Sequence, residues 1–179
     1  MPKSLERRYK VATSMKVSLA YGSHLPCLIK AVEKTNGDIL ELGTGVFSTP
    51  YLRYVAMLSG RRLVSYENFK PWYDFMLKYW KPNENHYINF VKEYSKAPLD
   101  ELWDIVLIDQ TPDISRSEEA IRLKDKAKYI ILHDSNPSNY KVTHYDKIYD
   151  QFKYKTDWMG DNNRATVVSN LVDLKDFWK

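Results

Sequence analysis

The most constraining feature of this chain is the stretch over residues 38–49, which reads DILELGTGVFST. Its short apolar run predicts a buried strand, and the two glycines after it predict a sharp turn into a helix. Gly43 and Gly45 let the backbone approach a ligand where a Cβ would collide. Ser48 or Thr49 is predicted to cap the helix, whose free N–H groups suit a polar or anionic group. A nucleotide-like ligand is the expected occupant, and a tight turn without a ligand is the alternative.

Length, charge and cysteine content limit the classes of protein to which this chain can belong. The 179 residues fit a single domain that spans 1–179. The net charge of +4 comes from lysines and arginines scattered among acids, which does not indicate a nucleic-acid partner. The N-terminus is charged and Lys16 interrupts the next apolar stretch, so we expect neither a signal peptide nor a membrane span, and a cytoplasmic location. Cys27 is the single cysteine, which excludes an internal disulfide and predicts a small packed side chain.

Strand-like and helix-like segments alternate along the chain, which is typical of a parallel sheet with helices on both faces. The predicted strands span 38–42, 63–66, 86–91, 103–108 and 129–132. The predicted helices span 26–34, 49–58, 71–81, 115–127 and 142–151. Ser115 and Glu118 form a capping-box pattern at the start of the fourth of these helices.

Two further strand-like runs, 152–156 and 165–169, are joined by a turn-forming cluster over residues 160–163. The connection has no room for a crossover helix, so these strands must pair antiparallel. A dinucleotide-binding fold would instead end in a sixth parallel strand. The sequence therefore predicts an α/β, Rossmann-like sheet of seven strands, five of them parallel and two in a C-terminal antiparallel hairpin, with helices on both faces.

Five parallel strands closed by such a hairpin resemble the fold of class I S-adenosylmethionine-dependent methyltransferases, over residues 24–171. Within that superfamily the chain is similar to a small uncharacterised subgroup of bacterial and phage methyltransferase-like proteins. The segments that carry this similarity are Gly22-Ser23-His24, Ser48-Thr49-Pro50, Leu132-His133-Asp134-Ser135, Phe152-Lys153-Tyr154-Lys155 and Thr166-Val167-Val168-Ser169. The resemblance implies S-adenosylmethionine as the cofactor.

The resemblance also implies which residues hold that cofactor. Glu41 is expected near its methionyl part, and Glu67, after the second strand, is expected to accept two hydrogen bonds from the ribose diol. His24 precedes the first helix, and residues 1–23 are expected to form an N-terminal extension or lid. The complete predicted cofactor-binding set is His24, Glu41, Gly43, Thr44, Gly45, Ser48, Thr49, Glu67, Asn68 and Asp109.

The candidate catalytic residues are Asp109, His133 and Asp134, which follow the fourth and fifth parallel strands beside the expected methyl donor. Histidine exchanges protons near neutral pH, so this group suits removal of the proton from a hydroxyl acceptor. Asp109 and Asp134 could instead bind Mg²⁺, as the similarity to catechol-type O-methyltransferases implies. His133 could also be a strand-end histidine that bonds to a loop.

The leading hypothesis is an enzyme that transfers a methyl group from S-adenosylmethionine to a hydroxyl of a small acceptor, such as a sugar or metabolite. Residues 109–112 lack the double proline and aromatic of amino-group DNA methyltransferases. The charged set of RNA ribose methyltransferases lacks its last member, because Ser169 ends the final strand. A nucleic-acid partner is therefore not expected. The alternatives are a catalytically inactive cofactor-binding or scaffold protein and an NAD-dependent reductase, since Glu67 lies about 20 residues beyond the glycines.

Overall fold

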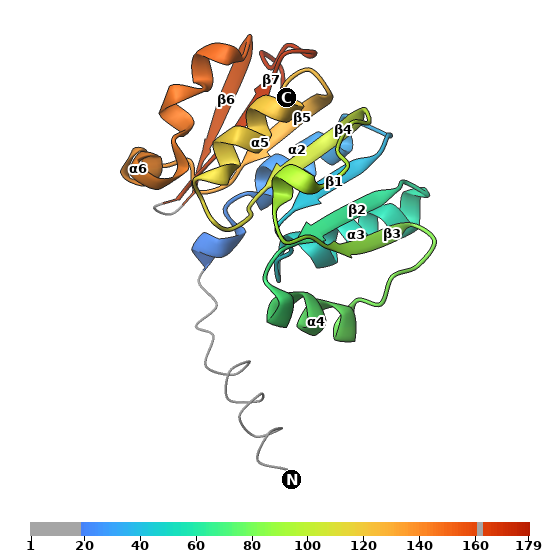
Figure 1. The fold of residues 1–179 in the computed structure, drawn as a ribbon. Coiled ribbons are helices and arrows are strands. Elements are labelled where there is room, and N and C mark those ends of the chain that lie inside the picture. Colours follow the sequence, from blue (N-terminus) through green and yellow to red (C-terminus); the bar gives the residue numbers. More distant parts are fainter. Residues whose placement is uncertain (1–18, 161–162) are drawn as a thin grey trace.

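The computed structural model describes residues 19–160 and 163–179. These residues form one sheet with the strand order β3-β2-β1-β4-β5-β7-β6 (Figure 1). Strands β1 to β5 run parallel, and β7 lies antiparallel between β5 and β6. The strands are β1 (Ile39–Leu42), β2 (Leu63–Glu67), β3 (His86–Phe90), β4 (Trp103–Ile108), β5 (Ala127–Leu132), β6 (Tyr154–Met159) and β7 (Arg164–Ser169). The predicted fold class is confirmed. Residues 1–18, most of the predicted extension or lid, lie outside the described residues.

Helices cover both faces of the sheet, with α2 and α3 packed on one face and α5 on the other (Figure 1). The α-helices of the described residues are α2 (Leu25–Glu33), α3 (Ser48–Ser59), α4 (Lys70–Tyr79), α5 (Ser115–Leu123) and α6 (Tyr140–Thr143). Helix α4 contacts β2 and β3. None of the helices in the described part of the chain is long and apolar enough to cross a bilayer.

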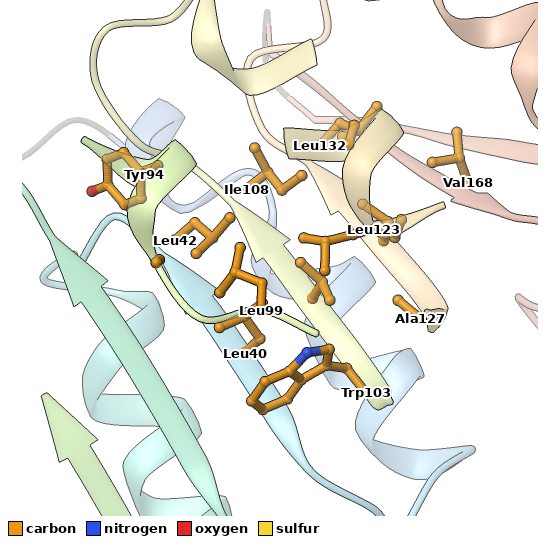
Figure 2. Close-up of a cluster of buried hydrophobic side chains, with 14 of the residues drawn as sticks. Leu40, Leu42, Tyr94, Leu99, Trp103, Ile108, Leu123, Ala127, Leu132 and Val168 are labelled. Atoms are coloured by element: carbon orange, nitrogen blue, oxygen red, sulfur yellow. The ribbon is translucent and has the colours of Figure 1, made fainter. Parts of the chain in front are cut away.

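Side chains along β4 alternate between two buried clusters, one on each face. Val106 and Ile108 belong to the cluster beneath α5, which Figure 2 shows around Ile108. Ile105 and Leu107 pack against α2 and α3 on the opposite face. All four side chains are fully buried, and each burial of this kind stabilises the fold by about 1.5–3 kcal/mol. Because both faces of β4 are covered, its sequence reads as a continuous apolar run.

The register of the parallel strands brings the chain segments after β1, β2 and β4 to one edge of the sheet. Leu42 is paired with Tyr66 on β2 and with Ile108 on β4. Just beyond β1, the N–H of Gly43 donates to the carbonyl of Tyr66 at 2.9 Å, and the N–H of Asp109 donates to the carbonyl of Leu42 at 2.8 Å. These hydrogen bonds hold the loops after β1 and β4 close together.

The predicted helix over 142–151 is wrong. The structure has only the short helix α6 there, followed by two 3₁₀ turns, η4 (Tyr145–Lys147) and η5 (Tyr149–Gln151). His144 adopts a left-handed conformation with φ of +55°, which ends α6. Tyr145, the next residue, is fully buried in the cluster beneath α5. Burial of this aromatic ring redirects the chain, which a helical pattern alone does not reveal.

Element boundaries also differ from prediction near α5 and β6. Ser115 does not cap α5, because it lies inside the helix and its hydroxyl donates to the carbonyl of Pro112 at 2.8 Å. The predicted capping box is therefore wrong. Helix α5 ends at Leu123, so β5 begins two residues before the predicted strand, at Ala127. The hairpin strand β6 begins at Tyr154, two residues after the predicted start.

Candidate cofactor and catalytic site

A cavity of about 420 Å³ opens where the loops after β1, β2 and β4 meet. This position, at the carboxyl ends of parallel strands, is where open α/β sheets bind ligands, and the volume lies in the range of small-molecule sites. The lining residues are Gly43, Thr44, Glu67, Asn68, Phe69, Trp72, Asp109, Gln110, Thr111 and Pro112. Half of the predicted cofactor set therefore lines the cavity: Gly43, Thr44, Glu67, Asn68 and Asp109.

Glu67, the residue predicted to bind a ribose, already has four protein donors. Its Oε2 accepts hydrogen bonds from the backbone N–H and the hydroxyl of Thr44, at 3.1 and 2.9 Å. Its Oε1 accepts from the backbone N–H groups of Asn68 and Phe69, at 2.9 and 2.8 Å. A carboxylate offers about four acceptor positions, so all of them are used. A ligand that bonds to Glu67 must displace one of these donors, and the freely rotating Thr44 hydroxyl is the simplest to displace.

An aromatic wall beside Glu67, formed by Phe69 and Trp72, lies outside the predicted cofactor-binding set. Phe69 lines the cavity with 63% of its surface exposed. The indole N–H of Trp72 donates to the carbonyl of Thr44 at 2.8 Å, which fixes this ring against the loop after β1. Across the cavity, the Asn68 side-chain amide donates to the carbonyl of Thr111 at 2.6 Å. In the sequence, the aromatic residues at the start of the helix directly after Glu67 indicate this wall.

Gly43 is required by the protein's own backbone. Its φ is +89°, in the region that side chains disfavour, and a Cβ there would lie 2.5 Å from the carbonyl oxygen of Asp109 and 2.7 Å from the nitrogen of Gln110. The interpretation that this glycine mainly clears space for a ligand is therefore incomplete. A Cβ on Gly45 would meet only the Ser48 hydroxyl, at 3.1 Å.

Glu41 and Thr49 support the glycine loop from below and do not line the cavity. Glu41 is fully buried, and its carboxylate accepts hydrogen bonds from the hydroxyls of Thr49, at 2.9 and 3.0 Å, and Ser65, at 2.6 Å. Burial raises the pKa of Glu41 to about 7, against the opposing effect of these hydrogen bonds. The Thr49 hydroxyl also accepts the N–H of Gly45 at 2.9 Å. Thr49 thus links the loop to Glu41.

The predicted helix cap at Ser48 or Thr49 is wrong, because Phe47 occupies the N-cap position of α3 without a side-chain hydrogen bond. Both Ser48 and Thr49 lie inside the first turn of the helix and are fully buried. The Thr49 hydroxyl has a partner there, because it donates to the buried carboxylate of Glu41 below the loop.

The three candidate catalytic residues do lie together. Nδ1 of His133 is 2.8 Å from Oδ1 of Asp109 and 3.3 Å from Oδ2 of Asp134. On the other side of the ring, Nε2 of His133 is 3.1 Å from the hydroxyl of Ser23. These contacts form a chain from Ser23 through His133 to Asp109. Ser23, which precedes α2, was not in the predicted catalytic set.

The electrostatics of this chain make His133 more basic than an ordinary histidine. Burial lowers the pKa of His133, but the charge of Asp109, the hydrogen bond to it and the charge of Asp134 outweigh burial and raise the pKa above its ordinary value. Burial raises the pKa of Asp109, yet the charge and hydrogen bond of His133 and the charge of Arg116 hold that pKa below its ordinary value. His133 is only 3% exposed and Ser23 only 8%, so Ser23 covers one side of the imidazole.

Arg116 occupies the space between the acids proposed as Mg²⁺ ligands. Its guanidinium lies 3.2 Å from Asp109, 3.2 Å from Asp113 and 3.3 Å from Asp134. The guanidinium of Arg116 already occupies the space between Asp109 and Asp134, so this pair does not suit a Mg²⁺ ion between its members. The residues present therefore do not fit the predicted Mg²⁺ site.

His24 lies beside His133 and not at the cavity. Its ring meets the ring of His133 edge-on, with centroids 4.7 Å apart. Only 1% of His24 is exposed, and neither of its ring nitrogens has a hydrogen-bond partner. Burial, together with the charge of His133, lowers the pKa of His24 to about 3 against the opposing charge of Asp109. The imidazole of His24 is thus neutral at physiological pH.

Solved structures share this fold. The N-terminal domain of human METTL16 in complex with SAH has a TM-score of 0.59 at 11% identity, over 84% of this chain and 70% of that chain. The METTL16 catalytic domain in complex with the MAT2A 3′UTR hairpin 1 has a TM-score of 0.59 at 11% identity, over 89% and 75%. A human methyltransferase 10 domain containing protein has a TM-score of 0.57 at 13% identity, over 84% and 83%.

The fold is therefore that of the Rossmann-like, class I S-adenosylmethionine-dependent methyltransferases. At such low identity the likeness shows the fold alone. No protein-family model matches the sequence, and no curated protein matches it. The similarity to a bacterial and phage subgroup stays a prediction.

Proposed function

We propose that this protein is an S-adenosylmethionine-dependent methyltransferase whose acceptor is a hydroxyl of a small molecule, such as a sugar or metabolite. The observation that carries the proposal is the cavity at the ends of β1, β2 and β4, in a sheet with the strand order of methyltransferases. A carboxylate at the end of β2 and an aromatic wall beside it suit a ribose and a planar base. The SAH in the METTL16 neighbour supports the same cofactor class.

The residues around the cavity divide the binding of the cofactor between them. Glu67 accepts the ribose hydroxyls once the Thr44 hydroxyl turns away from Oε2. Phe69 offers an exposed ring face for a base. When bound, S-adenosylmethionine supplies an electrophilic methyl group on a sulfonium. Asp109 lines the same cavity and so lies close enough to orient an acceptor. Holding both reactants in line supplies up to about 7–11 kcal/mol of the barrier reduction in well-oriented systems.

The chain of Ser23, His133 and Asp109 provides a path for the acceptor's proton. With a proton on Nδ1 that is donated to Asp109, the imidazole of His133 presents the lone pair of Nε2 to the Ser23 hydroxyl. An acceptor hydroxyl that reaches Ser23 would give its proton to Ser23 as the Ser23 proton moves to Nε2. S-adenosylmethionine, held by Glu67 and Phe69, would supply the methyl group to the acceptor oxygen and would keep the bonding electrons on its sulfur. Asp109 stabilises the imidazolium that results.

Isothermal titration with S-adenosylhomocysteine, S-adenosylmethionine and NADH tests the cofactor. We expect binding of the first two ligands, loss of at least tenfold in affinity for Glu67→Gln, and parent affinity for Glu84→Gln. Glu84 is an exposed acid before β3, away from the cavity. Binding of NADH alone would favour the reductase alternative and contradict the proposal, as would unchanged affinity of Glu67→Gln.

Mass spectrometry of candidate acceptors tests the reaction. The screen contains hydroxylated sugars and metabolites, and an RNA hairpin is included because one METTL16 neighbour was crystallised with one. We expect a mass gain of one methyl group on a small hydroxylated acceptor, abolished by His133→Gln and reduced by Ser23→Ala. Methylation of the RNA alone would overturn the acceptor class. Cofactor binding with no methylation of any acceptor would favour the inactive, scaffold alternative.

A further inference from the structure

Three side chains from separate elements meet behind the cavity: His24 before α2, Asp109 after β4 and His133 after β5. Each offers one metal-binding atom, and the three atoms lie within 4.8 Å of one another. The rings of His24 and His133 meet edge-on, and Asp109 bonds to His133 at 2.8 Å. No other group of three such ligands occurs among residues 19–160 and 163–179.

His24 is the part of this cluster that the proton path does not use. It is almost fully buried, and both of its ring nitrogens lack a partner. A buried polar group without a hydrogen bond destabilises a fold unless something else satisfies it. An imidazole nitrogen binds a metal through its lone pair, and neither nitrogen of His24 is engaged in a hydrogen bond. A ligand that accepts this lone pair would satisfy the otherwise unexplained nitrogen.

The charges around the cluster leave room for a cation. Asp109, Asp113 and Asp134 surround Arg116, the single guanidinium that contacts them among the described residues. Three carboxylates therefore share a single guanidinium. Arg116 and His133 both contact Oδ1 of Asp109, and none of the hydrogen bonds of the described residues uses Oδ2. A divalent ion would add positive charge beside these carboxylates.

We propose that His24, Asp109 and His133 form a binding site for a late first-row transition-metal ion, for which Zn²⁺ is the probe. Two imidazoles and one carboxylate are a donor set that suits such ions and leaves a position for water, whereas Mg²⁺ prefers oxygen ligands. Bonds of about 2.0–2.2 Å would place the ligand atoms roughly 3.3 Å apart, so the side chains must draw together by up to about 1.5 Å.

Metal binding and the proposed proton path exclude each other, because both use His133. The imidazole bonds to Asp109 through Nδ1 and to Ser23 through Nε2, so a metal on either nitrogen replaces one of these hydrogen bonds. This consequence rests on the proposed function, but the site itself does not. Metal uptake is therefore measured on the chain alone, without cofactor or acceptor, so that failure of either proposal is seen separately.

The experiment titrates the EDTA-treated full chain with Zn²⁺ by calorimetry and repeats the titration with Mg²⁺. The test variants are His24→Phe, which keeps the ring volume and removes both nitrogens, and Asp109→Asn, which removes the charge at nearly constant shape. The matched control is His144→Asn, a histidine outside the cluster whose left-handed backbone asparagine tolerates. Circular dichroism shows which variants fold.

We expect one Zn²⁺ per chain, no Mg²⁺ uptake, a loss of about tenfold or more in Zn²⁺ affinity for both test variants, and an unchanged affinity for His144→Asn. Absence of Zn²⁺ uptake by the parent chain would overturn the site. The site is equally overturned if His24→Phe binds Zn²⁺ as tightly as the parent, or if His144→Asn loses it. Should His24→Phe fail to fold, the affinity of Asp109→Asn decides.

Discussion

Thr44 donates both its backbone N–H and its hydroxyl to one carboxylate oxygen of Glu67, at 3.1 and 2.9 Å. With the N–H groups of Asn68 and Phe69 on the other oxygen, the acid that should bind a ribose is fully engaged by its own chain. The hydroxyl of Thr44 therefore competes with the proposed ligand for the same acceptor position.

Thr44→Val is expected to tighten binding of S-adenosylhomocysteine by about tenfold. The substitution keeps the shape of the side chain and removes one donor to Glu67, and a hydrogen bond to a charged group is worth about 1.5–3 kcal/mol. Calorimetric titration measures the change. Thr156→Val, in β6, is the control and should bind as the parent does. Weaker binding by Thr44→Val would show that the hydroxyl helps the ligand.

Gly43→Ala is expected to destabilise the fold by more than about 3 kcal/mol, because it combines an unfavourable φ with overlap against the backbone of Asp109. Gly60→Ala is the matched control. Gly60 also has a positive φ, +69°, but a Cβ there meets nothing within 4 Å, so about 1 kcal/mol should be lost. Urea denaturation measures both. Equal losses of stability in the two variants would show that the overlap with Asp109 is not the cause.

Glu41→Gln is expected to abolish one source of pH dependence in stability. Burial raises the pKa of Glu41 from 4.5 to about 7 in the folded chain. The folded state therefore holds this proton more tightly than the unfolded state, and the associated stability, roughly 3 kcal/mol, is present below pH 4.5 and lost as the pH rises through 7.

The measurement compares the free energy of unfolding of the parent and Glu41→Gln from about pH 4.5 to 8. Relative to the parent, the variant should gain stability as the pH rises across this window, because glutamine carries no charge to bury. Other titrating groups cancel in this difference. A difference that stays constant with pH would mean that Glu41 keeps an ordinary pKa.

Arg116→Met is expected to destabilise the fold by about 3–5 kcal/mol, since it leaves three acids without their shared buried cation. Arg62→Met is the control. Arg62 also pairs with two acids, Asp38 and Glu101, but its side chain is 36% exposed, so about 1 kcal/mol or less should be lost. Thermal unfolding compares the two. Similar losses would show that Arg116 contributes no more than a surface pair.

Much of the sheet is predictable because a continuous apolar run in the sequence indicates a strand that is buried on both faces. The residues of β4 form a continuous apolar run because helices cover both of their faces. The hairpin of β6 and β7 follows from a connection too short for a helix. The helix expected over 142–151 fails because one positive φ at His144 and the buried ring of Tyr145 redirect the chain, and neither changes the hydrophobic period.

The site is predictable in its positions and less so in its contacts. Residues at strand ends, such as Glu67 and Asp109, meet because parallel strands end at the same edge. The partners of these residues depend on side-chain packing across the chain. Ser23 is 110 positions from His133 in the sequence, and no local spacing predicts that contact. The roles assigned to the cofactor-binding and catalytic residues stay predictions.

Gly43 lies against the peptide that joins Asp109 to Gln110, with no side chain between the two backbones. The backbones of the turns after β1 and β4 are thus in direct contact at Gly43, so neither turn can move toward the other without displacing it. Pressure from an occupant on the first turn would reach Asp109 through this contact and through the hydrogen bond between its N–H and the Leu42 carbonyl. Filling of the cavity would in this way be coupled to the orientation of the Asp109 carboxylate.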